Sequence, residues 1–252
     1  MNKWRSRLWL KLIILTLISC IFSISIKSVV VHSQPSLSTA LPPLKIHTLP
    51  KFLANWQDTT NSGDYFSQIK STYLGYLIWS SFPVKIFIEQ PQIIEESAAN
   101  QRFGRWVETI NTAIAQWNIY FPLQKVNKPE LADIIIKRSI PEREITLNTD
   151  TGLYDIPRAI TAQTNYSFYL KQNPPVIAHR MTIVISPNYT GTSLLATVRH
   201  ELGHALGIWG HSPLESDALY FSQVSNPPAI SPRDLNTLKK IYQQPTKLGW
   251  HI

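Results

Sequence analysis

The stretch HELGHALGIWGH, residues 200–211, constrains the fold of this chain more than any other part of its 252 residues. Residues four apart lie on one face of an α-helix, so His200 and His204 can point their imidazoles at the same ion. Gly207 can adopt the left-handed conformation that ends a helix, and His211 follows four residues later. Three imidazoles with an open fourth ligand position are typical of a catalytic zinc site rather than a structural one.

Glu201 follows the first of these histidines and is not needed to bind a metal. A carboxylate beside a zinc-bound water suits a general base, because zinc lowers the pKa of that water to about 7. Glu201 would take the proton as the water attacks a carbonyl, and would then pass it to the leaving amine. The motif therefore predicts peptide hydrolysis without a covalent intermediate.

With these residues the sequence resembles the metzincin zinc metallopeptidases, in particular their matrixin-like branch. The family motif HExxHxxGxxH is carried by His200, Glu201, His204, Gly207 and His211. The resemblance implies a zincin-like α+β catalytic domain with a small twisted mixed sheet, an active-site helix and a C-terminal helix. It also implies one catalytic Zn²⁺ and a peptide substrate that binds in extended form along an edge strand.

The family carries a methionine in a tight turn beneath the metal, and this chain departs from that pattern. Its methionines are Met1 and Met181, and neither follows the motif. By alignment, Leu219 takes the place of the methionine, and Tyr220 takes that of a tyrosine at the wall of the substrate pocket. The exchange of methionine for leucine nearly conserves volume, so we expect zinc binding to survive it. Phe221 stands where many matrixins have proline.

Periodicity predicts a mixed α/β pattern in one domain that spans residues 81–252. Apolar alternation and short apolar runs predict strands. By chain order, the resemblance implies that residues 159–169 are the substrate-binding edge strand. Apolar residues three or four apart predict an amphipathic helix over 102–121, and Ser231 and Pro232 predict the start of a C-terminal helix. The other predicted strands are 82–89, 132–138 and 179–186.

Residues 1–33 have a basic leader followed by an uncharged apolar run, which predicts export. The run fits a cleaved signal peptide, an uncleaved membrane anchor, or a lipoprotein signal in which Cys20 is lipidated. Residues 34–80 begin as a Pro/Ser-rich linker and become more structured. They fit a tether, a short pro-segment that inhibits the site, or an extension packed on the catalytic domain.

The formal net charge of +8 does not indicate a nucleic-acid partner. Five basic residues and no acidic residue lie in 1–33; without them the chain has 19 basic and 16 acidic residues, a net charge of +3. No dense Lys/Arg run remains. We expect a monomer whose partner is a protein or peptide substrate, with membrane contact only through the N-terminal segment.

Other metal sites and latency devices have little support in the sequence. Asp150 and Asp155 could serve a Ca²⁺ ion. The single cysteine, Cys20, allows no intramolecular disulfide, and no later cysteine could block the zinc. We expect the scattered histidines outside the motif to lie at the surface or to cap helices. These are His32, His47, His179 and His251.

Together these features predict an exported zinc-dependent endopeptidase, in which Glu201 activates a zinc-bound water. Two alternatives stay open. One is a catalytically weak or inactive metzincin-fold surface or binding protein that keeps a structural zinc. The other is a hydrolase that uses the same zinc geometry on a non-peptide amide.

Overall fold

The computed structural model describes residues 41–91, 97–142, 161–222 and 226–252, together with residues 146, 147, 149, 152, 154, 155 and 224. The predicted leader with Cys20 lies outside these residues. Ala40–Ile252 forms one compact unit. Among the helices described, none combines the length and the apolar character needed to cross a membrane.

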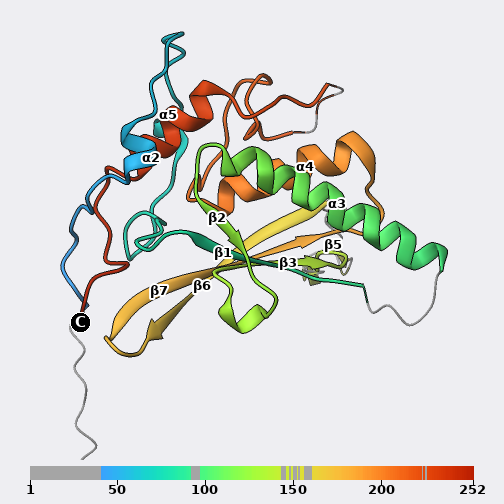
Figure 1. Cartoon of the computed structure of the whole chain (residues 1–252), viewed down its shortest axis with the longest axis horizontal. Coiled ribbons are helices and arrows are strands. Elements are labelled where there is room, and N and C mark those ends of the chain that lie inside the picture. Colours follow the sequence, from blue (N-terminus) through green and yellow to red (C-terminus); the bar gives the residue numbers. More distant parts are fainter. Residues whose placement is uncertain are drawn as a thin grey trace, which may run out of the picture. The chain divides into compact units, whose positions relative to one another are not determined.

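A five-stranded mixed sheet, in the order β2-β1-β3-β7-β6, is the centre of this unit (Figure 1). Four of its strands run parallel, and β6 pairs antiparallel with β7 at one edge. A second sheet joins two short strands, β4 and β5. The bounds are β1 Val84–Ile88, β2 Leu123–Lys125, β3 Ile134–Arg138, β4 Thr146–Leu147, β5 Tyr154–Asp155, β6 Ala162–Lys171 and β7 Val176–Ile185.

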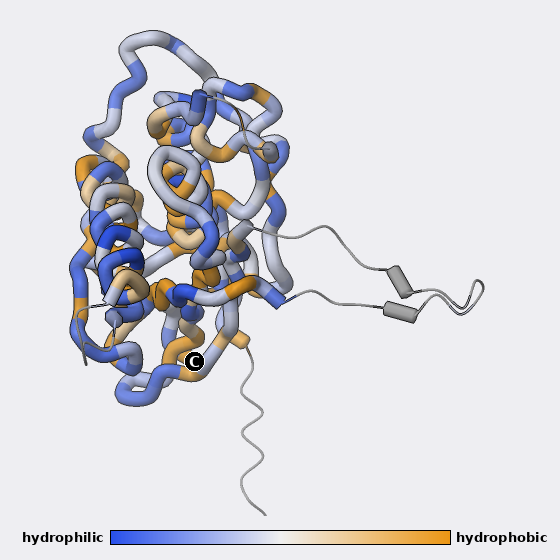
Figure 2. The backbone as a smooth tube through the Cα atoms, turned by 90° about the vertical axis from the view of Figure 1, so that its right-hand side faces the viewer, coloured by the Kyte–Doolittle hydropathy of each residue, from blue (hydrophilic) through white to orange (hydrophobic). Residues whose placement is uncertain are grey.

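Helices cover one face of the sheet. Burial alternates along β7, where every second residue from Ile177 to Ile185 is buried, as expected for a sheet packed on one face. The long helices α3 and α4 lie together across that face (Figure 1), and apolar residues recur at intervals along the backbone (Figure 2). The helices are α2 Lys51–Ala54, α3 Ala98–Asn118, α4 Gly191–Ala205 and α5 Pro232–Ile241, and the 3₁₀ turns are η1 Phe66–Gln68 and η2 Pro129–Leu131.

The predicted α+β class and its longer elements are confirmed, with shifted ends. The helix predicted over 102–121 begins earlier, because Ser97 caps it by accepting a hydrogen bond from the Asn100 backbone N–H. Its buried stripe runs through Trp106, Ile110 and Trp117, and Val107 beside it is only half-buried. The C-terminal helix has the predicted cap: Ser231 and Asp234 form a reciprocal capping box.

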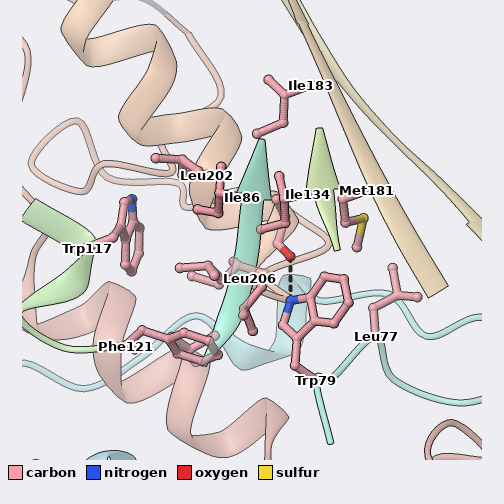
Figure 3. Packing of buried hydrophobic residues seen from close by; sticks show 14 of the residues in the cluster. Leu77, Trp79, Ile86, Trp117, Phe121, Ile134, Met181, Ile183, Leu202 and Leu206 are labelled. Carbon is pink, nitrogen blue, oxygen red and sulfur yellow. Dashed lines mark hydrogen bonds between the residues drawn. The ribbon is translucent and has the colours of Figure 1, made fainter. Parts of the chain in front are cut away.

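The structure does not divide the chain at residue 80. Leu77 and Trp79 lie in the same hydrophobic cluster as the sheet and α4 (Figure 3). The Trp79 indole N–H donates to the Ala205 carbonyl at 2.9 Å, which connects this segment to the end of α4. Lys45 and Thr246 exchange both of their backbone hydrogen bonds. The described part of residues 34–80 is therefore an extension packed on the domain predicted to begin at residue 81, and not a free tether.

One histidine departs from the predicted surface or capping positions. His179 is buried in β7 and stacks on Trp79, with ring centroids 3.9 Å apart. Burial lowers its pKa to about 3. His47 stacks on Trp250 and bonds to the Leu248 carbonyl, and His251 is exposed. His179 is on the buried face because strand alternation, and not residue polarity, decides the side to which it points.

A pair of leucine substitutions tests whether residues 41–80 are part of the fold. Leu77 is 1% exposed and Leu44 is 53% exposed. We expect Leu77→Ala to lower the free energy of unfolding by about 2–5 kcal/mol, because it leaves a cavity in the core. We expect Leu44→Ala to change it by less than about 0.5 kcal/mol. Urea unfolding followed by tryptophan fluorescence measures both, and equal effects would contradict the packing described.

Candidate metal centre

Helix α4 presents the histidine pair because its other side is buried. Val198 and Leu202 are fully buried on the side that faces the sheet. Leu194, four residues before Val198, completes this stripe, whereas its neighbour Leu195 is only half-buried. The Trp117 indole N–H donates to the Arg199 carbonyl at 2.9 Å and so fixes α4 against α3.

Two glycines return the chain to the metal centre after α4. Gly207 has φ +124°, and a Cβ there would lie 2.5 Å from the Leu77 carbonyl oxygen. A Cβ on Gly210 would overlap the Gln68 carbonyl oxygen. Gly207 must be glycine because of its positive φ, and at both positions a Cβ would clash with a backbone oxygen. The predicted role of Gly207 is confirmed, and His211 follows this turn.

His200, His204 and His211 form a cluster that could hold a metal ion, with one nitrogen from each ring within 4.8 Å of the others. The Nε2 atoms of His200 and His204 are 3.1 Å apart. The Nδ1 atoms face backbone carbonyls: that of His200 is 3.0 Å from Ala218 O, and that of His204 is 2.7 Å from Ile208 O. A proton on each Nδ1 satisfies the carbonyl and leaves the Nε2 lone pair for a metal, the usual arrangement of metal-binding imidazoles.

The electrostatic environment keeps these imidazoles neutral, which is the form that binds metals. Burial lowers the pKa of His200 and of His204 to about 4 each. Burial also lowers the pKa of His211, and the nearby charge of Lys70 adds to that shift. Three neutral imidazoles fit Zn²⁺, and also suit the divalent ions of copper, iron and nickel.

Glu201 is the acidic residue of this centre. Its carboxylate is buried and accepts a hydrogen bond from the Thr164 hydroxyl of β6, with Oε2 and Oγ1 2.6 Å apart. Burial raises the pKa of Glu201. Thr164 has no counterpart among the sequence predictions. Strand alternation in AQTNY places it on one face of β6, but only the packing of α4 brings that face to Glu201.

Leu219 and Tyr220 lie in a tight turn next to α4. The turn closes with a hydrogen bond from the Tyr220 backbone N–H to the Asp217 carbonyl. Leu219 is fully buried, and its Cδ2 would be 2.5 Å from a Cβ built on Gly203, between the two turns of helix that carry His200 and His204. Leu219 therefore packs against α4 at Gly203.

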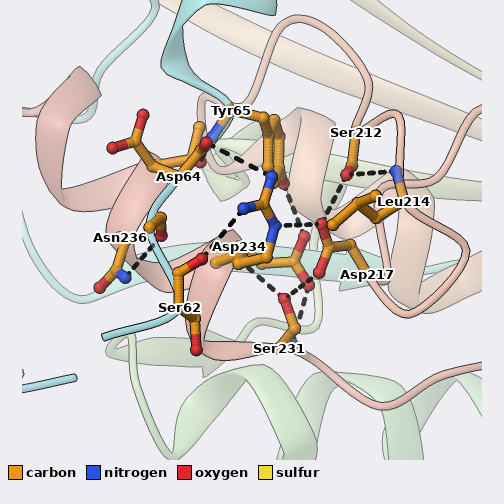
Figure 4. Close-up of polar contacts among 12 residues, drawn as sticks. Ser62, Asp64, Tyr65, Ser212, Leu214, Asp217, Ser231, Asp234 and Asn236 are labelled. Atoms are coloured by element: carbon orange, nitrogen blue, oxygen red, sulfur yellow. Dashed lines mark hydrogen bonds and ion pairs between the residues drawn. The ribbon is translucent and has the colours of Figure 1, made fainter. Parts of the chain in front are cut away.

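A buried polar network, which the sequence did not reveal, supports this turn (Figure 4). Asp217 accepts hydrogen bonds from Ser212 at 2.5 Å and from Ser231 at 2.7 Å, and forms an ion pair with Arg233 at 3.0 Å. Asp234 accepts from the Ala218 backbone N–H, the residue whose carbonyl faces His200.

Tyr65 connects the N-terminal extension to this network. Its hydroxyl donates to Asp234 at 2.6 Å, and its side chain is buried. Arg233 donates to the carbonyls of Ser62 and Asp64. The partners of Asp234 that lie 16 and 169 residues away have no local signature in the sequence.

Two cavities open beside the histidines and meet at Ala162, His200, Glu201 and Phe221. The first, here called the Tyr220 cavity, has a volume of about 220 Å³. The second, called the Trp209 cavity, has a volume of about 590 Å³. Thr161, Thr197, Tyr220 and Pro228 line the first. Lys70, Gln163, Thr164, Trp209 and His211 line the second.

The predicted calcium site falls mainly outside the described residues. Asp150 is not among them, and Asp155 contributes its backbone to β5. Among the described residues, the three motif histidines are the one group of three or more His, Cys, Asp or Glu residues that could hold a metal ion.

A scan against protein-family models finds no match to the chain, and a search of curated proteins finds no similar sequence.

Metal titration tests the histidine cluster. We expect the purified protein to bind one Zn²⁺ per chain, because three neutral imidazoles converge on one point. At a free Zn²⁺ concentration 100 times the Kd, the gain in the free energy of unfolding is about 2.7 kcal/mol. His211→Ala removes an exposed ligand and should abolish this gain, whereas His251→Ala, also exposed, should keep it. Isothermal titration and thermal unfolding with and without a chelator measure these effects. Equal binding by both variants would exclude the site.

A double-mutant cycle tests the contact between Gly203 and Leu219. Gly203→Ala gains up to about 1 kcal/mol of helix propensity, but its Cβ meets Leu219. We therefore expect a net loss of about 1–3 kcal/mol of unfolding free energy. With Leu219→Ala already present, the same substitution should cost at least about 1 kcal/mol less. Urea unfolding of the four proteins gives the coupling, and strictly additive effects would show that the two residues do not touch.

Proposed function

We propose that this chain is an exported zinc-dependent endopeptidase of the metzincin, matrixin-like type. The observation that carries the proposal is the meeting of three neutral imidazoles and one buried carboxylate in a single open cleft. Buried titratable groups with shifted pKa values in a cleft are typical of catalytic sites. A purely structural metal site needs neither the carboxylate nor the two cavities beside it.

The residues that would hold zinc are His200, His204 and His211, and the donor set fits the ion. When bound, zinc would act as a Lewis acid that polarises the scissile carbonyl and lowers the pKa of water. The carbonyls of Ala218 and Ile208 keep the His200 and His204 rings in orientation. These contacts preorganise two ligands, so less ordering is needed when an ion binds.

Glu201 moves the proton in the proposed reaction. Its raised pKa suits a group that first takes a proton and then returns it near neutral pH. The Thr164 hydroxyl holds Oε2, which leaves Oε1 for the attacking water. As the water oxygen bonds to the carbonyl carbon, Glu201 takes its proton. The C–N bond then breaks and that proton passes to the leaving nitrogen, so one water and one peptide bond give one acid and one amine.

The sheet edge offers the binding mode for a peptide. β6 is the last strand of its sheet, so an extended peptide can add to it by main-chain hydrogen bonds. The two cavities lie along the start of β6, on either side of Glu201. A peptide bound there has side chains that can enter both cavities, which supports an endopeptidase.

The family assignment rests on local chain order. His211, rather than a distant residue, completes the histidine cluster after the Gly207 turn. The turn with Leu219 packs under the helix, and Tyr220 lines the adjoining cavity. These features match the metzincin pattern with leucine in place of methionine.

Substitution of Glu201 distinguishes the endopeptidase hypothesis from the hypothesis of a non-catalytic protein with a structural zinc. We expect Glu201→Gln to lower kcat/KM on an unfolded protein substrate by about 10²–10⁴-fold, because it removes the general base. Zinc stoichiometry should stay at one per chain. Glu108→Gln, on the exposed side of α3, makes the same chemical change away from the cleft and should cleave like wild type.

The outcomes distinguish the candidate functions. If zinc-loaded residues 34–252 cleave no more than Glu201→Gln, the endopeptidase proposal fails and a structural zinc protein is favoured. If they hydrolyse small non-peptide amides but no peptide, the different hydrolase is favoured. Export rests on residues 1–33 alone, and N-terminal sequencing of the mature protein tests it.

A further inference from the structure

An exposed lysine, Lys70, stands at the wall of the Trp209 cavity. Lys70 lines it together with Trp209 and His211. Among residues 41–91, 97–142, 161–222 and 226–252, no carboxylate lies within ion-pair distance of its ammonium. Glu201 is the one acidic residue that lines this cavity, and it is held by Thr164. The charge of Lys70 is therefore available to a ligand.

The backbone around Lys70 is fixed next to the metal centre. The Lys70 backbone N–H donates to the Trp209 carbonyl at 2.9 Å. Gly210 packs so closely on Gln68 and Ile69 that no side chain fits between them. The backbone of Lys70 is thus held in place beside the loop that carries His211. Only the flexible Lys70 side chain has to adapt to a ligand.

The two cavities differ in charge. Apart from His200, the ionisable groups that line the Tyr220 cavity are Glu201, Asp217 and Tyr220, and Asp217 is paired with Arg233. The described part of this cavity has no Lys or Arg, whereas the Trp209 cavity has Lys70. A ligand that lies across both cavities therefore meets positive charge at one end only.

Strand direction decides which part of a peptide meets Lys70. An antiparallel partner is the more stable one for an edge strand, and β6 already pairs antiparallel with β7. The Tyr220 cavity includes Thr161 and Ala162, and the Trp209 cavity includes Ala162, Gln163 and Thr164. An antiparallel peptide has its N-terminal part at the later residues of β6, which is the side of the Trp209 cavity.

We propose that Lys70 selects peptides with an acidic side chain on the N-terminal side of the scissile bond. This proposal rests on the proposed function, because a scissile bond requires that the peptide is cleaved. Recognition of the acidic group itself does not need catalysis. The ammonium of Lys70 pairs with the peptide carboxylate at a cleft wall, where the field is stronger than on an open surface. An exposed ion pair contributes up to about 1 kcal/mol, which is about a fivefold preference.

Quenched fluorescent peptides test this selection. Each set is identical except for Glu, Gln or Lys at one of the three positions before the cleaved bond. For zinc-loaded wild type at low salt, we expect kcat/KM to favour Glu over Gln about fivefold at one of these positions. Lys70→Met should remove the preference, and Lys70→Glu should reverse it in favour of Lys. Added salt at 0.5 M should weaken the wild-type preference, because it screens exposed charges.

Lys128→Glu is the matched control. It makes the same charge change on an exposed lysine after β2, at the opposite edge of the sheet, and should keep the wild-type preference. A preference for Glu that persists in Lys70→Met would overturn the assignment to Lys70. Equal rates for Glu, Gln and Lys at all three positions would overturn it as well, and would leave the endopeptidase proposal intact.

A binding measurement separates the two proposals. Fluorescence anisotropy with the zinc-loaded Glu201→Gln protein reports affinity for the same peptides in the absence of turnover. If no peptide is cleaved by wild type, but the acidic peptide binds about fivefold more tightly and only when Lys70 is present, the endopeptidase proposal fails and the role of Lys70 stands. If the acidic and amide peptides bind equally with and without Lys70, the role of Lys70 is refuted.

Discussion

The hydrogen bonds from the His200 and His204 rings to backbone carbonyls determine how the rest of the candidate metal centre is arranged. Each carbonyl fixes the tautomer and the orientation of one ring. One of them, at Ile208, belongs to the chain just after α4 and follows from the helix end. The other, at Ala218, comes from a separate turn, so the position of that turn decides whether His200 points correctly.

Much of the remaining structure holds that turn in place. Leu219 contacts α4 at Gly203, and Asp234 binds the Ala218 backbone N–H from α5. Asp234 is buried, and burial raises its pKa, so its hydrogen bonds with Tyr65 and the backbone are needed to keep the charge. Since a buried carboxylate that loses its partners is costly, the network favours one arrangement of the turn. The histidine cluster is therefore held by contacts from three distant parts of the chain.

The sequence predicted the features of this site that depend on local spacing. The four-residue interval of His200 and His204, the conformation of Gly207 and the cap at Ser231 all express backbone geometry within a few residues. The sequence did not predict Thr164, whose contact with Glu201 depends on the packing of two distant elements. It placed His179 at the surface or at a helix cap because a lone histidine carries little ligand signal, whereas strand alternation buries it. Long-range packing, and not local propensity, accounts for these differences.

The same packing limits what a removable pro-segment could include. Trp79 and Tyr65 donate hydrogen bonds to the end of α4 and to Asp234, and the chain at Gln68 contacts Gly210 beside His211. Loss of residues 65–80 would leave the Asp234 carboxylate without the Tyr65 hydroxyl and would remove buried side chains from the core. The chain is already bound to this network at Ser62, whose carbonyl accepts a hydrogen bond from Arg233. Residues 62–80 therefore belong to the packed structure that supports the three histidines.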